Sequence, residues 1–142
     1  MIQPVHPLGR VFIIGIGGAG MSALARILLA QGAVVAGSDA KDSRRIHKLR
    51  SLGIEVFIGH ERAHLVGSSG IALYDTVCFS TAIPSSNIEL QTAQEFAINI
   101  LSRAELLVDL TRNSEVLSVT GTHGKTTTTS LLTLGLQYAG DD

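Results

Sequence analysis

The amino-acid sequence predicts an α/β fold in which a parallel β-sheet carries helices on both of its faces. Short apolar segments alternate along the chain with amphipathic ones, and no internal repeat interrupts this alternation. Two glycine-rich corners each follow an expected strand and precede an expected helix. Since strand–helix–strand units are the building blocks of parallel sheets, the alternation indicates this architecture.

Strands are expected where apolar residues run together in short segments, namely residues 11–15, 34–38, 55–58, 75–80, 98–101 and 116–120. Helices are expected where apolar residues recur with helical spacing, namely residues 19–31, 43–52, 86–96, 102–110 and 125–138. Residues 86–89 (SNIE) and 102–105 (SRAE) have the spacing of a capping box, so each is expected to open its helix. Gly53 stands where the residue after a helix end belongs.

A polar run at residues 111–115 separates two strand–glycine–helix units and is expected to be a domain boundary. Residues 1–112 then form one domain, and residues 113–142 form the start of a second. One strand and one helix are too little to bury a core alone. We therefore expect the second part either to dock on the first domain or to belong to a longer chain that has been cut.

Composition argues against two classes of partner. The formal net charge is −1 and no basic block is present, so binding to long nucleic acid is not expected, because it requires several Lys or Arg against phosphates. The longest apolar run, residues 11–21, is too short to span a bilayer, and no signal peptide is recognisable. A cytoplasmic location without membrane contact is expected. Cys78 lies in an apolar stretch and is expected to be a buried free thiol.

The first glycine-rich corner, residues 15–20 (GIGGAG), fits the G-x-G-x-x-G pattern of diphosphate-binding turns. Gly15 permits the tight turn, Gly17 lets backbone amides approach a diphosphate, and Gly20 lets the helix pack close to the strand. The diphosphate would lie at the positive end of the helix dipole. Asp39 ends the next expected strand, where a carboxylate can accept hydrogen bonds from ribose hydroxyls.

The second corner, residues 121–127 (GTHGKTT), ends like a P-loop and opens the last expected helix. In such a loop backbone amides cradle phosphates, Lys125 reaches the β- and γ-phosphate oxygens, and the Thr126 hydroxyl can hold Mg²⁺. Val119 stands where the common P-loop has its first glycine.

The combination of the two corners narrows the function. A hydride-transferring enzyme of this fold needs one dinucleotide site and no P-loop, and a simple P-loop ATPase has no use for a diphosphate cradle upstream. An enzyme that uses ATP on a nucleotide-linked substrate needs both. Two alternatives stay open on the residues alone. One is an NAD-dependent oxidoreductase domain, which leaves residues 121–127 unexplained, and the other is a non-catalytic nucleotide-binding module.

At this point the chain resembles the Mur ligase family, and in particular its alanine-adding members. The resemblance is carried by residues 15–22 (GIGGAGMS), 37–39 (GSD), 58–60 (IGH), 103–105 (RAE) and 120–129 (TGTHGKTTTT). Residues 80–84 read STAIP where those members commonly read SSAIP, which exchanges one hydroxyl for another. The resemblance covers nearly the whole chain, and the chain corresponds to the N-terminal part of such an enzyme.

The resemblance implies a Rossmann-like domain over residues 1–112 that holds the UDP end of the substrate. Residues 113–142 would be the first strand and P-loop helix of an incomplete ATP-binding domain, and a further domain would close over both. The implied activity belongs to peptidoglycan precursor synthesis and uses ATP and Mg²⁺. The lactyl carboxylate of UDP-N-acetylmuramate attacks the γ-phosphate of ATP, and L-alanine then displaces phosphate from the acyl phosphate. The chain alone is expected to bind UDP-sugar but to be inactive.

The residues expected to bind the UDP moiety are Gly15, Gly17, Gly18, Ala19, Gly20, Ser38, Asp39, Ser80, Thr81 and Ala82. The residues expected to bind ATP are Gly121, Thr122, His123, Gly124, Lys125, Thr126 and Thr127. Of these, Lys125 and Thr126 are the candidates for catalysis and Thr126 for metal binding.

Three further residues carry open alternatives. His123 either faces phosphate or shapes the loop, and His60 either lines the UDP-sugar cleft or caps a turn. Arg103 could neutralise a substrate phosphate, because a guanidinium suits that geometry. The histidines without any ligand spacing, expected at the surface, are His6, His47 and His64.

Overall fold

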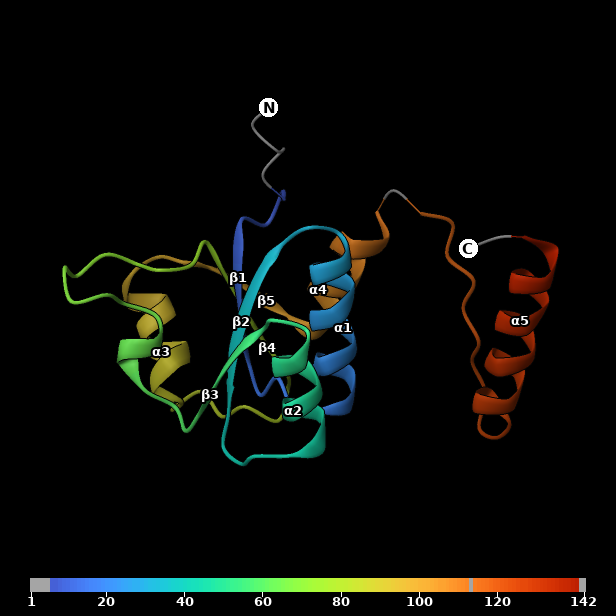
Figure 1. Ribbon diagram of the computed structural model, residues 1–142, viewed down its shortest axis with the longest axis horizontal. Helices are drawn as coiled ribbons and strands as arrows, with labels where there is room; N and C mark the ends of the chain where they lie inside the picture. Colours follow the sequence, from blue (N-terminus) through green and yellow to red (C-terminus); the bar gives the residue numbers. More distant parts are fainter. Residues whose placement is uncertain (1–5, 113, 141–142) are drawn as a thin grey trace. The chain divides into compact units, whose positions relative to one another are not determined.

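The computed structural model describes residues 6–112 and 114–140. The chain divides into two compact units, residues 1–112 and 113–142 (Figure 1). The elements of the first unit are β1 (Arg10–Ile14), α1 (Ala19–Ala30), β2 (Val34–Asp39), α2 (Arg44–Ser51), β3 (Glu55–Ile58), the 3₁₀ helix η1 (Arg62–His64), β4 (Thr76–Phe79), α3 (Ile88–Glu95), β5 (Asn99–Ser102) and α4 (Arg103–Thr111). The second unit contains α5 (Lys125–Ala139).

The first unit is built on a five-stranded sheet in the order β3-β2-β1-β4-β5, and every neighbouring pair is parallel. This is the predicted Rossmann-like architecture, with the chain reversing its direction of strand addition between β1 and β4. In sheets of this kind ligands bind outside the carboxyl ends of the strands at that reversal. The loop after β1 is therefore where the fold itself places a binding site.

The core lies on both faces of β1, whose residues Val11 to Ile14 are completely buried. Val11 and Ile13 pack with α1, α2 and Leu106 of α4, whereas Phe12 and Ile14 pack with α3 and the segment before β4. Figure 1 shows α3 on one side of the sheet and α1, α2 and α4 on the other. Burial on both faces explains why β1 reads as an unbroken apolar run rather than an alternating one.

Of the two predicted capping boxes, the one at the start of α4 forms and the one at the start of α3 does not. Ser102 caps α4 in a full capping box with Glu105, as the sequence predicts. The capping box predicted at residues 86–89 is wrong, because Asn87 is the cap of α3 and its Oδ1 accepts from the amides of Glu89 (2.9 Å) and Leu90 (3.2 Å). The Glu89 side chain turns into the interior instead and is fully buried.

The strand predicted at residues 116–120 does not form. Residues 114–124 contain no β-strand, and the chain enters α5 directly. A strand is stable only beside a hydrogen-bonding neighbour, and residues 114–140 contain no second strand to pair with it. The helix predicted at residues 125–138 is confirmed and runs from Lys125 to Ala139. Over the described residues, every helix is too short or too polar to cross a bilayer.

Candidate functional site

The glycine-rich corner between β1 and α1 is held in place by the end of β2. The Ser38 carbonyl accepts hydrogen bonds from the amides of Gly15 (2.8 Å) and Ile16 (3.0 Å), and the next amide, that of Gly17, donates to Asp39 Oδ2 (2.9 Å). Gly15 has a φ of 76°, which confirms that the tight turn needs a residue without Cβ. Consecutive amides of the corner are thus satisfied by two adjacent residues of the protein.

The amides left without a partner belong to the first residues of α1 rather than to the turn. Gly17 was expected to let backbone amides approach a diphosphate, and its own amide is bound to Asp39. The amide of Gly18 likewise donates to the Gly15 carbonyl (3.1 Å). Gly18 is the N-cap of α1 and provides no side-chain cap, so the amides of Ala19 and Gly20 face no acceptor within residues 6–112. An oxyanion at this end of α1 would meet those donors and the helix dipole.

Arg103, the first residue of α4, lies against the same helix end. A Cβ on Gly20 would stand only 2.8 Å from Nη1 of Arg103, so the guanidinium occupies the space that the missing side chain leaves. Gly20 was expected to allow close helix–strand packing, whereas the structure shows that it accommodates Arg103. No carboxylate of residues 6–112 forms an ion pair with this guanidinium. Its charge is available to an anionic ligand.

The turn after β4 also lies beside the glycine-rich corner. Residues 80–83 form a turn closed by the Ile83 amide on the Ser80 carbonyl (3.0 Å). The Ile83 side chain packs on Gly15, since a Cβ there would lie 3.2 Å from Ile83 Cδ1. The fold therefore brings Ser80, Thr81 and Ala82 to the same edge of the sheet as residues 15–20, and Thr81 and Ala82 are exposed there.

Ser38 is in the site region but does not face a ligand with its side chain. It is completely buried, and its hydroxyl donates to Glu89 Oε2 (2.5 Å). Ser38 was expected to bind the UDP moiety, and the burial of its side chain leaves only its backbone for such a contact. Ser38 acts on the corner through its carbonyl.

Glu89 is the residue that sequence reasoning missed, and His64 is one that it misplaced. His64 was expected at the surface, but its side chain is only 12% exposed, its ring stacks on Phe57 at 4.3 Å between centroids, and Nδ1 lies 2.7 Å from Glu89 Oε1. His60 Nδ1 lies 2.8 Å from the other oxygen of the same carboxylate. The apparent capping-box spacing concealed Glu89, because a glutamate near a helix start is normally solvated. His47 is exposed and His6 is partly exposed.

The second corner, residues 121–127, turns on two glycines and leads into α5. Gly124 caps α5 in the left-handed conformation with a φ of 77°, and Gly121 has a φ of 150°. No side chain caps α5, so the amides of its first turn, which includes Thr126 and Thr127, have no side-chain partner. Lys125 Nζ donates to the Gly121 carbonyl (2.6 Å), which keeps the ammonium at the loop.

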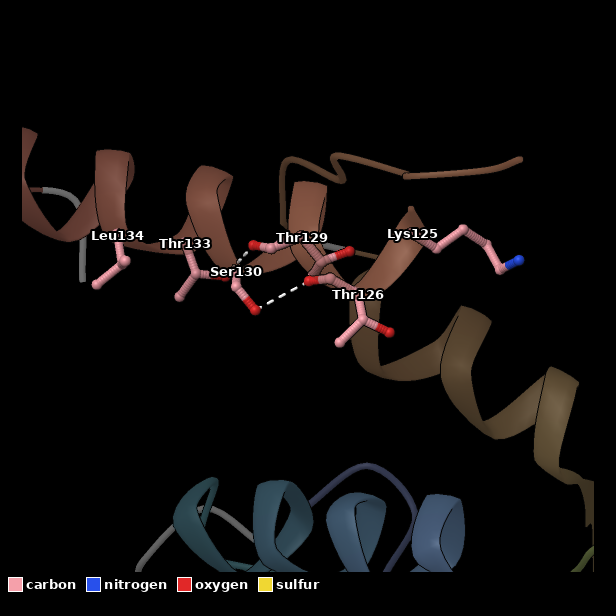
Figure 2. Close-up of a pocket in the computed structure, with 6 residues that line it drawn as sticks. All are labelled: Lys125, Thr126, Thr129, Ser130, Thr133 and Leu134. Carbon is pink, nitrogen blue, oxygen red and sulfur yellow. Dashed lines mark hydrogen bonds between the residues drawn. The ribbon is translucent and has the colours of Figure 1, made fainter. Parts of the chain in front are cut away.

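Some hydroxyl groups along α5 donate hydrogen bonds to carbonyls of the helix, and others have no such partner. Figure 2 shows Lys125 and Thr126 in the first turn, with Thr129, Ser130 and Thr133 following along the helix. The side chains of Ser130 and Thr133 donate to the carbonyls of Thr126 (2.9 Å) and Thr129 (2.8 Å). The Thr126 hydroxyl, in the first turn beside the loop, makes no hydrogen bond within residues 114–140, so it is free to bind a metal or nucleotide oxygen. Across the described residues, no three His, Cys, Asp or Glu side chains gather as a metal site.

Cys78 is a buried free thiol, as predicted. Burial raises the pKa of Cys78 to about 12, with smaller contributions from Asp109 and Glu105. A thiol with this pKa carries almost no thiolate at neutral pH, so it takes no part in the chemistry of the site.

The strand order and the glycine-rich corner at the sheet reversal define a Rossmann-like α/β protein, and the glycine-capped helix α5 follows as a separate unit. A family model described as "Mur ligase family, catalytic domain" matches residues 10–115, and the chain belongs to the Mur ligase family.

Similar proteins agree with this assignment. The chain is 45% identical over 141 residues to the UDP-N-acetylmuramate–L-alanine ligase of Nocardioides sp., covering 99% of this chain and 30% of that protein. Its fold matches the UDP-N-acetylmuramate-alanine ligase MurC of Thermotoga maritima with a TM-score of 0.80 and 32% identity over 92% of this chain and 29% of the other. A UDP-N-acetylmuramate:L-alanyl-γ-D-glutamyl-meso-diaminopimelate ligase of Neisseria meningitidis gives a TM-score of 0.81 and 34% identity, over 92% and 40%. The chain thus spans less than half the length of these relatives.

Proposed function

We propose that this chain supplies the UDP-binding domain and the start of the ATP-binding domain of a cytoplasmic ligase that joins L-alanine to UDP-N-acetylmuramate at the expense of ATP. The observation that carries the proposal is the meeting of Arg103 with the uncapped start of α1 at the sheet reversal. A guanidinium and free amides facing one point form a binding site for a diphosphate.

The proposal that a UDP-sugar is the substrate has broader support than the proposal that L-alanine is the added amino acid. Relatives that add alanine and relatives that add a tripeptide both carry UDP-N-acetylmuramate in their names. L-Alanine rests on the 45% identity to an alanine-adding enzyme, since no described residue of this chain is a candidate for binding the amino acid. In the proposed site, Ala19 and Gly20 donate to the diphosphate, Arg103 neutralises it, and the turn at residues 80–82 borders the uridine.

In the proposed reaction the lactyl carboxylate oxygen bonds to the γ-phosphorus of ATP and ADP leaves. The alanine nitrogen then bonds to the acyl carbon, phosphate leaves, and the nitrogen loses a proton. Lys125 and the first-turn amides of α5 balance the charge of the β- and γ-phosphates in the first step. Bound Mg²⁺ would add to that neutralisation, and the free Thr126 hydroxyl is suited to hold it. Gly121 and Gly124, with φ of 150° and 77°, support the proposal because a phosphate-binding loop needs residues that can take such turns.

The test is calorimetric titration of the 142-residue chain with UDP-N-acetylmuramate and, separately, with NADH. We expect saturable heat with the UDP-sugar, none with NADH, and no amide formation when ATP, Mg²⁺ and radiolabelled L-alanine are added. Binding of NADH without a response to the UDP-sugar would favour an oxidoreductase domain instead. Formation of labelled product by this chain alone would contradict the assignment of the alanine site to other residues.

A further inference from the structure

The buried carboxylate of Glu89, on α3, contacts side chains from three other segments of the first unit. Glu89 is fully buried at the start of α3, and its oxygens accept from the Ser38 hydroxyl (2.5 Å), His60 Nδ1 (2.8 Å) and His64 Nδ1 (2.7 Å). These partners come from the end of β2, the residue pair after β3 and the end of η1. A buried carboxylate is costly unless it is fully hydrogen-bonded, so this arrangement has a strong preference for one geometry.

The network is joined directly to the glycine-rich corner through Ser38. The side chain of Ser38 is fixed by Glu89, and its carbonyl holds the amides of Gly15 and Ile16. The next residue, Asp39, holds the amide of Gly17. A single residue, Ser38, therefore links the buried carboxylate to the turn before α1.

His60 connects the same carboxylate to the edge of the sheet. Its side chain is 21% exposed, while Nδ1 faces Glu89 and lies 3.0 Å from the Ser38 hydroxyl. It follows Gly59, whose amide donates to the Asp39 carbonyl (2.9 Å). With its hydrogen on Nδ1, the His60 ring donates to Glu89 and presents Nε2 to a hydroxyl or imide N–H.

We propose that Glu89 is a positioning residue of the UDP site, which sets the glycine-rich corner through Ser38 and the ring of His60 directly. This inference rests on the proposed function, because it assigns these residues to UDP binding. A purely structural network would stabilise α3 and the sheet without changing affinity for the nucleotide. A substitution of Glu89 therefore distinguishes the two roles, because only a positioning role predicts a change in UDP affinity as well as in stability.

The test compares Glu89→Gln with two control variants on the same helix. Glutamine keeps the shape but turns an amide NH₂ toward donors, so one partner of the network is lost. Glu95→Gln makes the same charge change at the exposed end of α3, where Glu95 pairs with Arg62. Leu90→Ala removes a buried apolar side chain beside Glu89 and lowers stability without touching the network. Binding of UDP is measured by calorimetry, melting temperature by circular dichroism, and the form of the His60 ring by ¹⁵N NMR.

We expect Glu89→Gln to weaken UDP binding about tenfold, the effect of one disrupted buried hydrogen bond, and to change the His60 ring signals. Glu95→Gln and Leu90→Ala should keep wild-type affinity and ring signals, even where the melting temperature falls. Wild-type affinity in Glu89→Gln with altered ring signals overturns the inference and leaves the proposed function intact. Absence of UDP binding by the wild-type chain overturns both. Where Glu89→Gln does not fold, Ser38→Ala replaces it, with weaker UDP binding expected and wild-type affinity as the contrary result.

Discussion

Substitution of Gly20 by alanine tests the diphosphate site with little disturbance of the fold. The new Cβ would stand 2.8 Å from Nη1 of Arg103 and 3.4 Å from its Cδ and Cζ, so the flexible guanidinium must move away. The α1 backbone can stay where it is. Alanine favours a helix over glycine by up to about 1 kcal/mol, so the melting temperature should be unchanged or slightly raised.

The expected loss appears in ligand affinity. A hydrogen bond to a charged group contributes about 1.5–3 kcal/mol, and the exposure of Arg103 places its contribution at the lower end. Displacement of the guanidinium should therefore weaken UDP binding about tenfold, which corresponds to about 1.4 kcal/mol. Complete removal of the guanidinium in Arg103→Ala should weaken binding by at least as much.

The assay is a double-mutant cycle measured by calorimetric titration with UDP. Gly20→Ala acts through Arg103, so the double variant should bind no more weakly than Arg103→Ala alone. Gly135→Ala in α5 is the matched control, because a Cβ there meets nothing within 4 Å. Additive losses in the double variant would show that Gly20→Ala does not act through Arg103. Wild-type affinity in Gly20→Ala would show that the position of the guanidinium beside Gly20 does not matter for the ligand.

Three further outcomes follow from the same structure. Because burial raises the pKa of Cys78 to about 12, a thiol reagent at mildly alkaline pH should modify the native chain far more slowly than the chain in denaturant, and equal rates would contradict this burial. Hydrogen bonds from Ser102 lower the pKa of Glu105, so its contribution to stability is present above its ordinary pKa of 4.5 and is lost as the pH falls below it. The difference in melting temperature between the wild type and Glu105→Gln should accordingly shrink in acid, and a constant difference would refute the linkage. Lys125→Ala should weaken binding of ATP and leave UDP affinity unchanged in calorimetric titrations, whereas a loss of UDP affinity would contradict separate sites.

The parallel sheet and its order of elements could be predicted because they depend on local patterns. An apolar run such as residues 11–15 is interpretable without knowledge of its neighbours, since burial on both faces leaves the same signature in any parallel sheet. The capping box at residues 102–105 is equally local and is confirmed. Gly53, with a φ of 87°, also takes the predicted left-handed conformation after α2.

What the sequence could not reveal depends on contacts between distant segments. Glu89 meets His60 and His64 only because η1 and α3 pack together beside the end of β3, and no spacing in the sequence records that meeting. The strand expected at residues 116–120 has the right composition but lacks a neighbour within residues 114–140. Strand formation requires a partner as well as propensity, and the sequence shows only propensity.

The central place of β1 has a consequence for the order in which this chain can assemble during synthesis. β1 emerges from the ribosome first, yet it pairs with β2 through Val11↔Val35 and with β4 through Val11↔Thr76. At about 5–20 residues per second, several seconds separate translation of the first partner from that of the second. During that interval one edge of the most apolar strand stays unpaired, which makes the nascent chain dependent on protection from aggregation until β4 arrives.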